Sequence, residues 1–276
     1  MPGEAAKSIL RFDRVSVSFD DVPALIDLSF EVREGGTRII LGAASSGKTV
    51  LLKTALGLVR PDSGSVYLFE QDITRLTEQQ LFDIRSKIGM LFQESALFDS
   101  LTIEENVAYP LLNQKAIHCP AEDVRGKVTE ALRFVELEET LARFPSELSG
   151  GMRRRAAIAR AVVTEPPLLL YDSPTAGLDP ITAHTIMALI IKERDLSNTT
   201  TLIVTHRYQD GNLVANFRYN PDSGQLVAAR TNGYQPQLRT KFLVLREGRL
   251  MFEGTQAELE ASSDPYIAKF RRQTGG

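Results

Sequence analysis

Phosphate chemistry is indicated by one short segment, Gly42-Ala43-Ala44-Ser45-Ser46-Gly47-Lys48-Thr49. Its spacing is G-x-x-x-x-G-K-[ST], the P-loop, in which backbone N–H groups wrap nucleotide phosphates. Gly47 allows close backbone approach, Lys48 brings an ammonium to the β- and γ-phosphates, and Thr49 offers a hydroxyl to Mg²⁺. A chance Gly/Ser-rich turn is the plain alternative. A buried-strand pattern over 37–41 and a helical pattern over 50–58 favour the phosphate site, since a helix N-terminus attracts anions.

Three further positions could act on the same phosphates. Asp172 follows the apolar run 168–171, and His206 follows the strand-like run 200–204. Ser149 and two glycines precede a helical pattern over 153–163, which would aim a hydroxyl and N–H groups at an anion. Taken alone, Ser-Gly-Gly is usually a linker and a single histidine is usually a surface or core residue. Their order after a P-loop favours a site.

The sequence patterns around these residues predict alternating strands and helices. Strand patterns cover 10–19, 28–32, 37–41, 90–92, 168–172 and 200–205, and a hairpin pattern covers 241–252. The stretch 94–160 is mostly helical, 181–195 is helical, and a final amphipathic helix is predicted over 256–272. Such alternation predicts an α/β fold with a largely parallel sheet, on which the helical stretch forms an inserted subdomain.

Composition narrows the class of protein. The chain has 276 residues, is 43% hydrophobic and has a formal charge of −3, so its charge offers no argument for nucleic acid. Cys119 is the only cysteine, which excludes an internal disulfide and fits a reducing compartment. We find no signal-peptide pattern and no apolar run long enough to span a bilayer, so a transport role would require a separate membrane partner.

Together these motifs resemble the ABC ATPase family over nearly the whole chain. The most specific match is Leu148-Ser149-Gly150-Gly151-Met152, which is similar to the family's signature motif. The resemblance implies a P-loop NTPase core of ABC type with an N-terminal antiparallel β-subdomain and an inserted α-helical subdomain. It implies one ABC ATPase domain over 1–276, with the core at about 1–93 and 160–276 and the helical signature subdomain at about 94–159.

The resemblance also implies roles for single residues. Phe19 would stack on adenine; a core strand residue is the plain alternative. Gln93 would contact Mg²⁺ and water, Asp172 would hold Mg²⁺, and His206 would contact the γ-phosphate. Asp179 lies in the loop that crosses a dimer interface, and Ser149 to Met152 would cover ATP on the partner subunit. The nucleotide-binding set is Phe19, Gly42, Ala43, Ala44, Ser45, Ser46, Gly47, Lys48, Thr49 and Val50; the metal set is Thr49, Gln93 and Asp172.

The sequence departs from the family immediately after Asp172. The family usually has a glutamate there, which polarises the attacking water as general base, but this chain has Ser173. Serine is no base near neutral pH without activation. ATP binding with slow hydrolysis is therefore expected. Ser173 could be natural, could be an engineered change that traps ATP, or could reflect pairing with a different ATPase subunit; we favour the first.

A second departure lies inside the P-loop. The family commonly has glycine where Ser45 stands and serine where Ala44 stands. If the loop requires a positive φ at Ser45, a side chain there costs some strain. We expect modestly altered nucleotide affinity rather than loss of binding.

Longer stretches resemble one subgroup, the Mce-associated, Mla-type lipid-transport ATPases. They are 89–98, 105–111, 145–155 and 179–182. This implies ATP and Mg²⁺ as cofactors, a membrane permease, a homodimer of ATPase subunits, an MCE-domain lipid carrier and no nucleic acid. It implies a cytoplasmic protein, peripheral on the inner face of the bacterial plasma membrane. The permease would dock on 97–107, unless these residues are simply core.

Alternatives remain open. A soluble ABC protein of translation or DNA repair would normally show paired nucleotide domains or coiled-coil insertions, whereas this chain has one P-loop. A catalytically weak, ATP-dependent scaffold or regulatory protein is motivated by Ser173. We interpret the arginines at 153–155 as a solvated, salt-bridged helix face. The segment 208–240 is insertion-like, with a β-hairpin predicted around the turn at 221–224.

Overall fold

The computed structural model describes residues 6–229 and 240–272, which divide into two compact units. The first unit comprises residues 1–76 and 191–276, and the second comprises residues 77–190. Helix α6 (Pro180–Ser197) runs through the boundary between them. The predicted helical segment 94–159 falls within the second unit. None of the described helices is both long enough and apolar enough to cross a membrane.

The first unit contains an antiparallel sheet with the strand order β2-β1-β4-β5. Its strands are β1 (Ser8–Phe19), β2 (Val22–Arg33), β4 (Ser63–Leu68) and β5 (Gln71–Asp72). Phe12 and Phe30 stack between β1 and β2 with ring centroids 4.9 Å apart. This sheet confirms the expected N-terminal antiparallel β-subdomain, although β2 is longer than the predicted strand over 28–32.

The same unit contains a second group of strands, ordered β12-β11-β3-β8. They are β3 (Thr37–Leu41), β8 (Thr200–Thr205), β11 (Thr240–Arg246) and β12 (Arg249–Gly254). β3 runs parallel to both β8 and β11, and β12 is antiparallel to β11. Every residue of β3 and β8 is buried. A near-continuous apolar run is the pattern of a strand covered on both faces.

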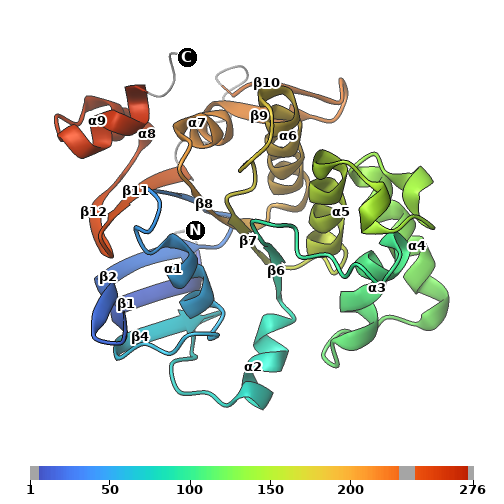
Figure 1. Cartoon of the computed structure of the whole chain (residues 1–276), viewed down its shortest axis with the longest axis horizontal. Coiled ribbons are helices and arrows are strands. Elements are labelled where there is room, and N and C mark those ends of the chain that lie inside the picture. Colours follow the sequence, from blue (N-terminus) through green and yellow to red (C-terminus); the bar gives the residue numbers. More distant parts are fainter. Residues whose placement is uncertain (1–5, 230–239, 273–276) are drawn as a thin grey trace, which may run out of the picture. The chain divides into compact units, whose positions relative to one another are not determined.

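Helices of the first unit follow these strands, as Figure 1 shows. They are α1 (Lys48–Ala55), α7 (Tyr208–Asn216), α8 (Gln256–Ala261) and α9 (Pro265–Arg272). The prediction of a single final helix over 256–272 is wrong, because two helices, α8 and α9, occupy this range. Asp264 accepts hydrogen bonds from the backbone N–H groups of Tyr266 and Ile267, and so begins a new helix in which Pro265 needs no N–H partner.

A β-hairpin follows α7, as predicted for the insertion-like segment. It pairs β9 (Phe217–Asn220) with β10 (Gln225–Ala228) through an exposed turn at 221–224. Arg194 lies under it and donates to the carbonyls of Val214 and Phe217. The remainder of the predicted insertion, 230–239, lies outside the described residues.

The second unit is mostly helical around one parallel strand pair, β6 (Ile88–Leu91) and β7 (Leu168–Asp172). Its helices are α2 (Glu78–Arg85), α3 (Ile103–Asn113), α4 (Ala121–Phe134), α5 (Gly150–Val162) and the larger part of α6, with short 3₁₀ turns at Glu138–Thr140 and Pro145–Glu147. Asn106 is fully buried on α3 and bonds both backbone groups of Phe98. These two bonds hold the segment between β6 and α3.

Candidate functional site

The P-loop connects β3 to α1 in the first unit. Gly47 is the N-cap of α1 with φ +103°, and a Cβ there would lie 2.6 Å from the Ala24 carbonyl oxygen. Gly42 has no room for a side chain either, because a Cβ would lie 2.8 Å from the Leu245 carbonyl oxygen. Both glycines of the motif are therefore required by the packing of the loop.

The Lys48 ammonium is folded into the loop. Its Nζ donates to the carbonyl oxygens of Gly42 at 2.8 Å and Ala43 at 2.7 Å, and to Ser46 Oγ at 3.3 Å. The side chain is mostly buried. A buried cation held by backbone carbonyls at a helix N-terminus attracts anions.

Ser45 has φ +61°, so the condition for strain at this position, a left-handed backbone, is met. The side chain is exposed and stores strain that glycine would not.

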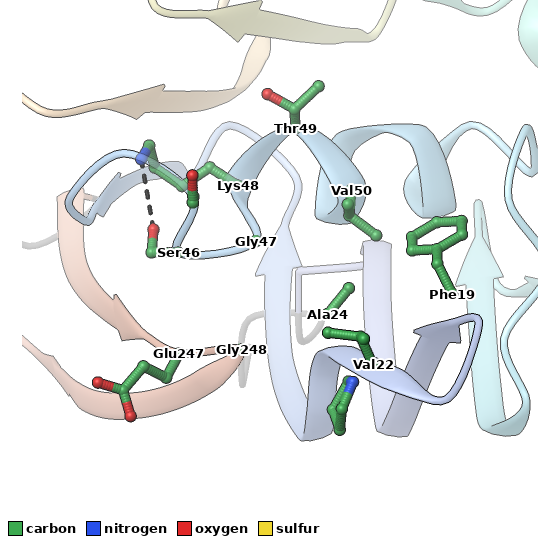
Figure 2. A pocket seen from close by; sticks show the side chains of 12 residues that line it. Phe19, Val22, Ala24, Ser46, Gly47, Lys48, Thr49, Val50, Glu247 and Gly248 are labelled. Atoms are coloured by element: carbon green, nitrogen blue, oxygen red, sulfur yellow. Dashed lines mark hydrogen bonds between the residues drawn. The ribbon is translucent and has the colours of Figure 1, made fainter.

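A cavity of about 460 Å³ lies beside the P-loop. Figure 2 places Phe19 next to Val50 at one end and Lys48, with its bond to Ser46, at the other. Phe19 is about half exposed. The predicted residues that line the cavity are Phe19, Ser45, Ser46, Gly47, Lys48, Thr49 and Val50; Gly42, Ala43 and Ala44 do not. An apolar end and a cationic end suit a molecule with one flat apolar ring and one anionic group.

Several cavity residues were not anticipated from the sequence: Val22, Pro23, Ala24, Glu247 and Gly248. The last two form the turn between β11 and β12. Gly248 N–H donates to the Ser46 carbonyl at 3.1 Å, and the Gly248 carbonyl accepts from Ile26 N–H at 2.9 Å. This turn therefore ties the phosphate loop to β2.

His206 lies in the same unit, at the end of β8. Leu41 and Thr205 are paired in the parallel register of β3 and β8, so the P-loop and His206 leave the sheet at one edge. Ligands of α/β folds bind at this carboxyl edge. Thr205 Oγ1 donates to buried Asp210 at 2.7 Å and accepts from Arg207 N–H at 3.1 Å. These bonds fix the turn that exposes His206.

The remaining predicted residues lie in the second unit. Asp172 ends β7 and is 5% exposed, while Gln93 is exposed just after β6. Ser149 is the N-cap of α5, and its Oγ accepts from Met152 N–H at 3.3 Å. Gly150 and Gly151 form the first turn of that helix, as the anion-binding interpretation requires. Among the described residues no cluster of three or more acidic, histidine or cysteine side chains could hold a metal ion by itself.

Asp179 caps α6. Its Oδ1 accepts from the N–H groups of Ile181 and Thr182, each at 3.0 Å. Hydrogen bonds from the Thr182 side chain and backbone hold the pKa of Asp179 below its usual value.

The predicted solvated, salt-bridged face at 153–155 is wrong for Arg154, whereas Arg153 and Arg155 are partly exposed and Arg155 pairs with Glu136 at 3.9 Å. Arg154 is 5% exposed and donates to the carbonyls of Phe92 at 2.9 Å and Ala176 at 3.4 Å. Burial lowers the pKa of Arg154, and the negative charge of Asp172 partly offsets this by raising it. Arg153 and Arg155 also donate chiefly to backbone carbonyls. Arg154 thus joins α5 to the residue before Gln93 and to the turn after Ser173.

Known proteins are similar to this chain in sequence. The family model described as ABC transporter matches residues 25–176. The chain is 33% identical to the intermembrane phospholipid transport ATP-binding protein MlaF of Haemophilus influenzae, over 88% of this chain and 83% of that protein. It is 40% identical to the methionine import ATP-binding protein MetN of Carboxydothermus hydrogenoformans and 38% identical to the probable ribonucleotide transport ATP-binding protein mkl of Mycobacterium leprae. It spans only 54% and 51% of those two proteins.

Solved structures of ATP-binding cassettes have a similar fold. The dimeric ATP-binding cassette MJ0796, in a post-hydrolysis state bound to ADP and Pi, is 28% identical to this chain. It matches with a TM-score of 0.73 over 90% of this chain and 98% of its own. The CbiO1 subunit of a Clostridium perfringens ABC transporter complex is 25% identical, with a TM-score of 0.74 over 97% of this chain and 94% of its own.

Proposed function

The chain belongs to the ABC transporter family as an ATP-binding ATPase subunit, and from that premise we propose that it drives lipid transport through a separate membrane permease. The supporting observation is the match to the phospholipid transport protein MlaF, which extends over most of both chains. The methionine and ribonucleotide transport proteins are matched over little more than half of their length.

ATP would occupy the cavity beside the P-loop. Phe19 and Val22 would contact the adenine, and the loop N–H groups and Lys48 would hold the phosphates. Transition-state charge on the phosphoryl group is stabilised mainly by such fixed positive groups. His206 would contact the γ-phosphate from the edge of the sheet that also carries the loop.

Mg²⁺ fits the residues present, because it usually keeps phosphate oxygens and waters and needs few protein ligands. Thr49 is one of the residues that line the cavity. The family resemblance assigns Gln93 and Asp172, which belong to the second unit, to the ion through water. When bound, Mg²⁺ supplies charge neutralisation to the phosphates.

Hydrolysis would be slow, because Ser173 stands where the family places its general base. A lost general base costs about 10²–10⁴-fold in rate. A catalytically weak scaffold is the second candidate function, and it rests on Ser173 alone.

The permease would dock beside α3, near the surface at 97–107 that the family resemblance implies. Phe98 and Tyr109 are exposed aromatic residues with ring centroids 4.7 Å apart. They line a cavity of about 270 Å³ together with Met90, Phe92 and Gln114. Val107 is instead fully buried and belongs to the core. The functional unit would be a homodimer on the inner face of the bacterial plasma membrane, with an MCE-domain lipid carrier in the same system and no nucleic acid.

The test uses the complex. Tagged chain would be purified with its membrane partner, and ATPase activity measured with phospholipid, methionine or ribonucleotide added. Stimulation by phospholipid alone supports lipid transport. Stimulation by methionine or by ribonucleotide would contradict lipid transport and identify that compound as the transported substrate. Nucleotide binding without turnover under every condition would favour the scaffold.

A further inference from the structure

The C-terminal helix α9 contacts the phosphate loop through one hydroxyl. Tyr266 Oη accepts a hydrogen bond from the Ala43 backbone N–H at 3.1 Å and donates to the Leu245 carbonyl at 3.2 Å. Ala43 is the second residue of the P-loop, and Leu245 lies in β11 against the loop's first glycine. The two bonds join α9, the loop and the sheet at one oxygen atom.

Tyr266 is itself held firmly. Asp264 caps α9 and accepts the Tyr266 N–H at 2.7 Å. The Tyr266 ring packs edge-on against Phe270 with centroids 5.3 Å apart, and the Arg246 guanidinium lies 5.2 Å from the ring centroid. Ile267 and Phe270 are buried. A ring fixed on several sides presents its hydroxyl in one place.

The bonds within the loop run to its carbonyl oxygens and to Ser46, whereas the Ala43 N–H is bonded from outside the loop. Ala43 is exposed, and its carbonyl accepts from Lys48 Nζ and from the Ser46 N–H. Its N–H is bonded from outside the loop, by Tyr266. Ser45 two residues later is strained at φ +61°. A loop that must hold phosphates with its N–H groups gains affinity when its backbone is fixed beforehand.

We propose that Tyr266 is a positioning residue of the nucleotide site: its hydroxyl fixes Ala43, and the docking of α9 thereby sets the affinity of the P-loop for ATP. The inference rests on the nucleotide site proposed above. Helix α9 is then a structural control on ATP binding, since whatever displaces it releases the first turn of the loop.

The test compares Tyr266→Phe with Tyr67→Phe, which removes a tyrosine hydroxyl from β4 in the same unit. Binding of mant-ATP with Mg²⁺ would be measured by fluorescence on the full chain. Tyr266→Phe keeps the ring contacts and is expected to raise Kd about 2- to 10-fold, as for one lost hydrogen bond. Melting temperature and saturated ATPase rate should stay near the wild type, and Tyr67→Phe should not change Kd.

Each outcome decides the matter. An unchanged Kd in a folded Tyr266→Phe variant overturns the inference, as does an equal change in Tyr67→Phe. A wild-type chain that does not bind mant-ATP would instead overturn the nucleotide site itself. If Tyr266→Phe does not fold, amide exchange of ¹⁵N-alanine-labelled wild type decides. Slow exchange at Ala43 supports the hydrogen bond, and exchange at the rate of an unstructured peptide contradicts it.

Discussion

The Ser173 hydroxyl donates a hydrogen bond to Asp172 Oδ1 at 3.1 Å. Both residues are buried at the end of β7, and Ser173 has φ +47°. The hydroxyl is thus engaged by the carboxylate assigned to Mg²⁺, and serine has no basic group to give to a water.

Restoring a carboxylate at this position should restore a general base. We expect Ser173→Glu to raise the steady-state ATPase rate of the complex by about 10²–10⁴-fold. Ser173→Gln is the matched control, because it has the same length without a base, and it should not gain activity. A rate in the glutamate variant equal to or below that of the wild type would refute the missing-base account.

Loss of the loop cation should abolish tight nucleotide binding. Lys48→Ala removes the ammonium proposed to hold the phosphates, and charged hydrogen bonds are worth about 1.5–3 kcal/mol. We expect Kd for ATP to rise at least about tenfold. Lys53→Ala removes an exposed lysine from the same helix and should bind normally. Equal affinities in the two variants, measured by calorimetry, would argue against the assigned role.

The left-handed backbone at Ser45 predicts opposite effects for two neighbouring glycine substitutions. Ser45→Gly should stabilise the chain by about 0.5–1 kcal/mol, because glycine adopts φ +61° without strain. Ala44→Gly should destabilise the chain. Ala44 has no positive φ, so glycine relieves no strain there and only increases the conformational entropy of the unfolded chain. Urea unfolding measures both. A shift of the same sign in the two variants would contradict the strain at Ser45.

Buried Arg154 should be needed for stability. Arg154→Met leaves the carbonyls of Phe92 and Ala176 without this donor, at a cost of about 1–3 kcal/mol. ATPase activity should fall as well, because these carbonyls flank Gln93 and follow Ser173. Arg125→Met, at an arginine whose side chain is 79% exposed, is the control. Matching melting temperatures for the two variants would show that burial of Arg154 carries no stability.

Acid should remove the capping contribution of Asp179. Its pKa is lowered in the folded chain, so the stabilisation is complete above the unfolded pKa of about 3.9 and is lost as the pH falls through the folded pKa. Melting temperatures between pH 3 and 7 would be compared with Asp179→Asn, which caps helices but does not titrate. The advantage of the wild type should shrink as the pH falls, and an advantage that grows in acid would contradict the assignment.

Much of the site could be predicted from the sequence because its residues follow short apolar strands in fixed local patterns. Gly42 to Thr49 and His206 follow buried strands, and Asp172 ends one, as predicted. The lining by Glu247 and Gly248 could not be predicted, since it follows from β11 lying beside β3, and strand order is not a local property. The prediction for Arg154 is wrong for a related reason. A run of arginines predicts solvent exposure, and the carbonyls of Phe92 and Ala176 that bind Arg154 are distant in the sequence.

The hairpin of β9 and β10 has a practical consequence. Its tip at 221–224 is exposed and joins two short strands that, among the residues the structure describes, pair with each other alone. Lengthening such a turn costs little loop-closure entropy and disturbs no buried hydrogen bond. An epitope or a small fluorescent tag inserted there would report on the assembled complex while both chain ends stay unmodified.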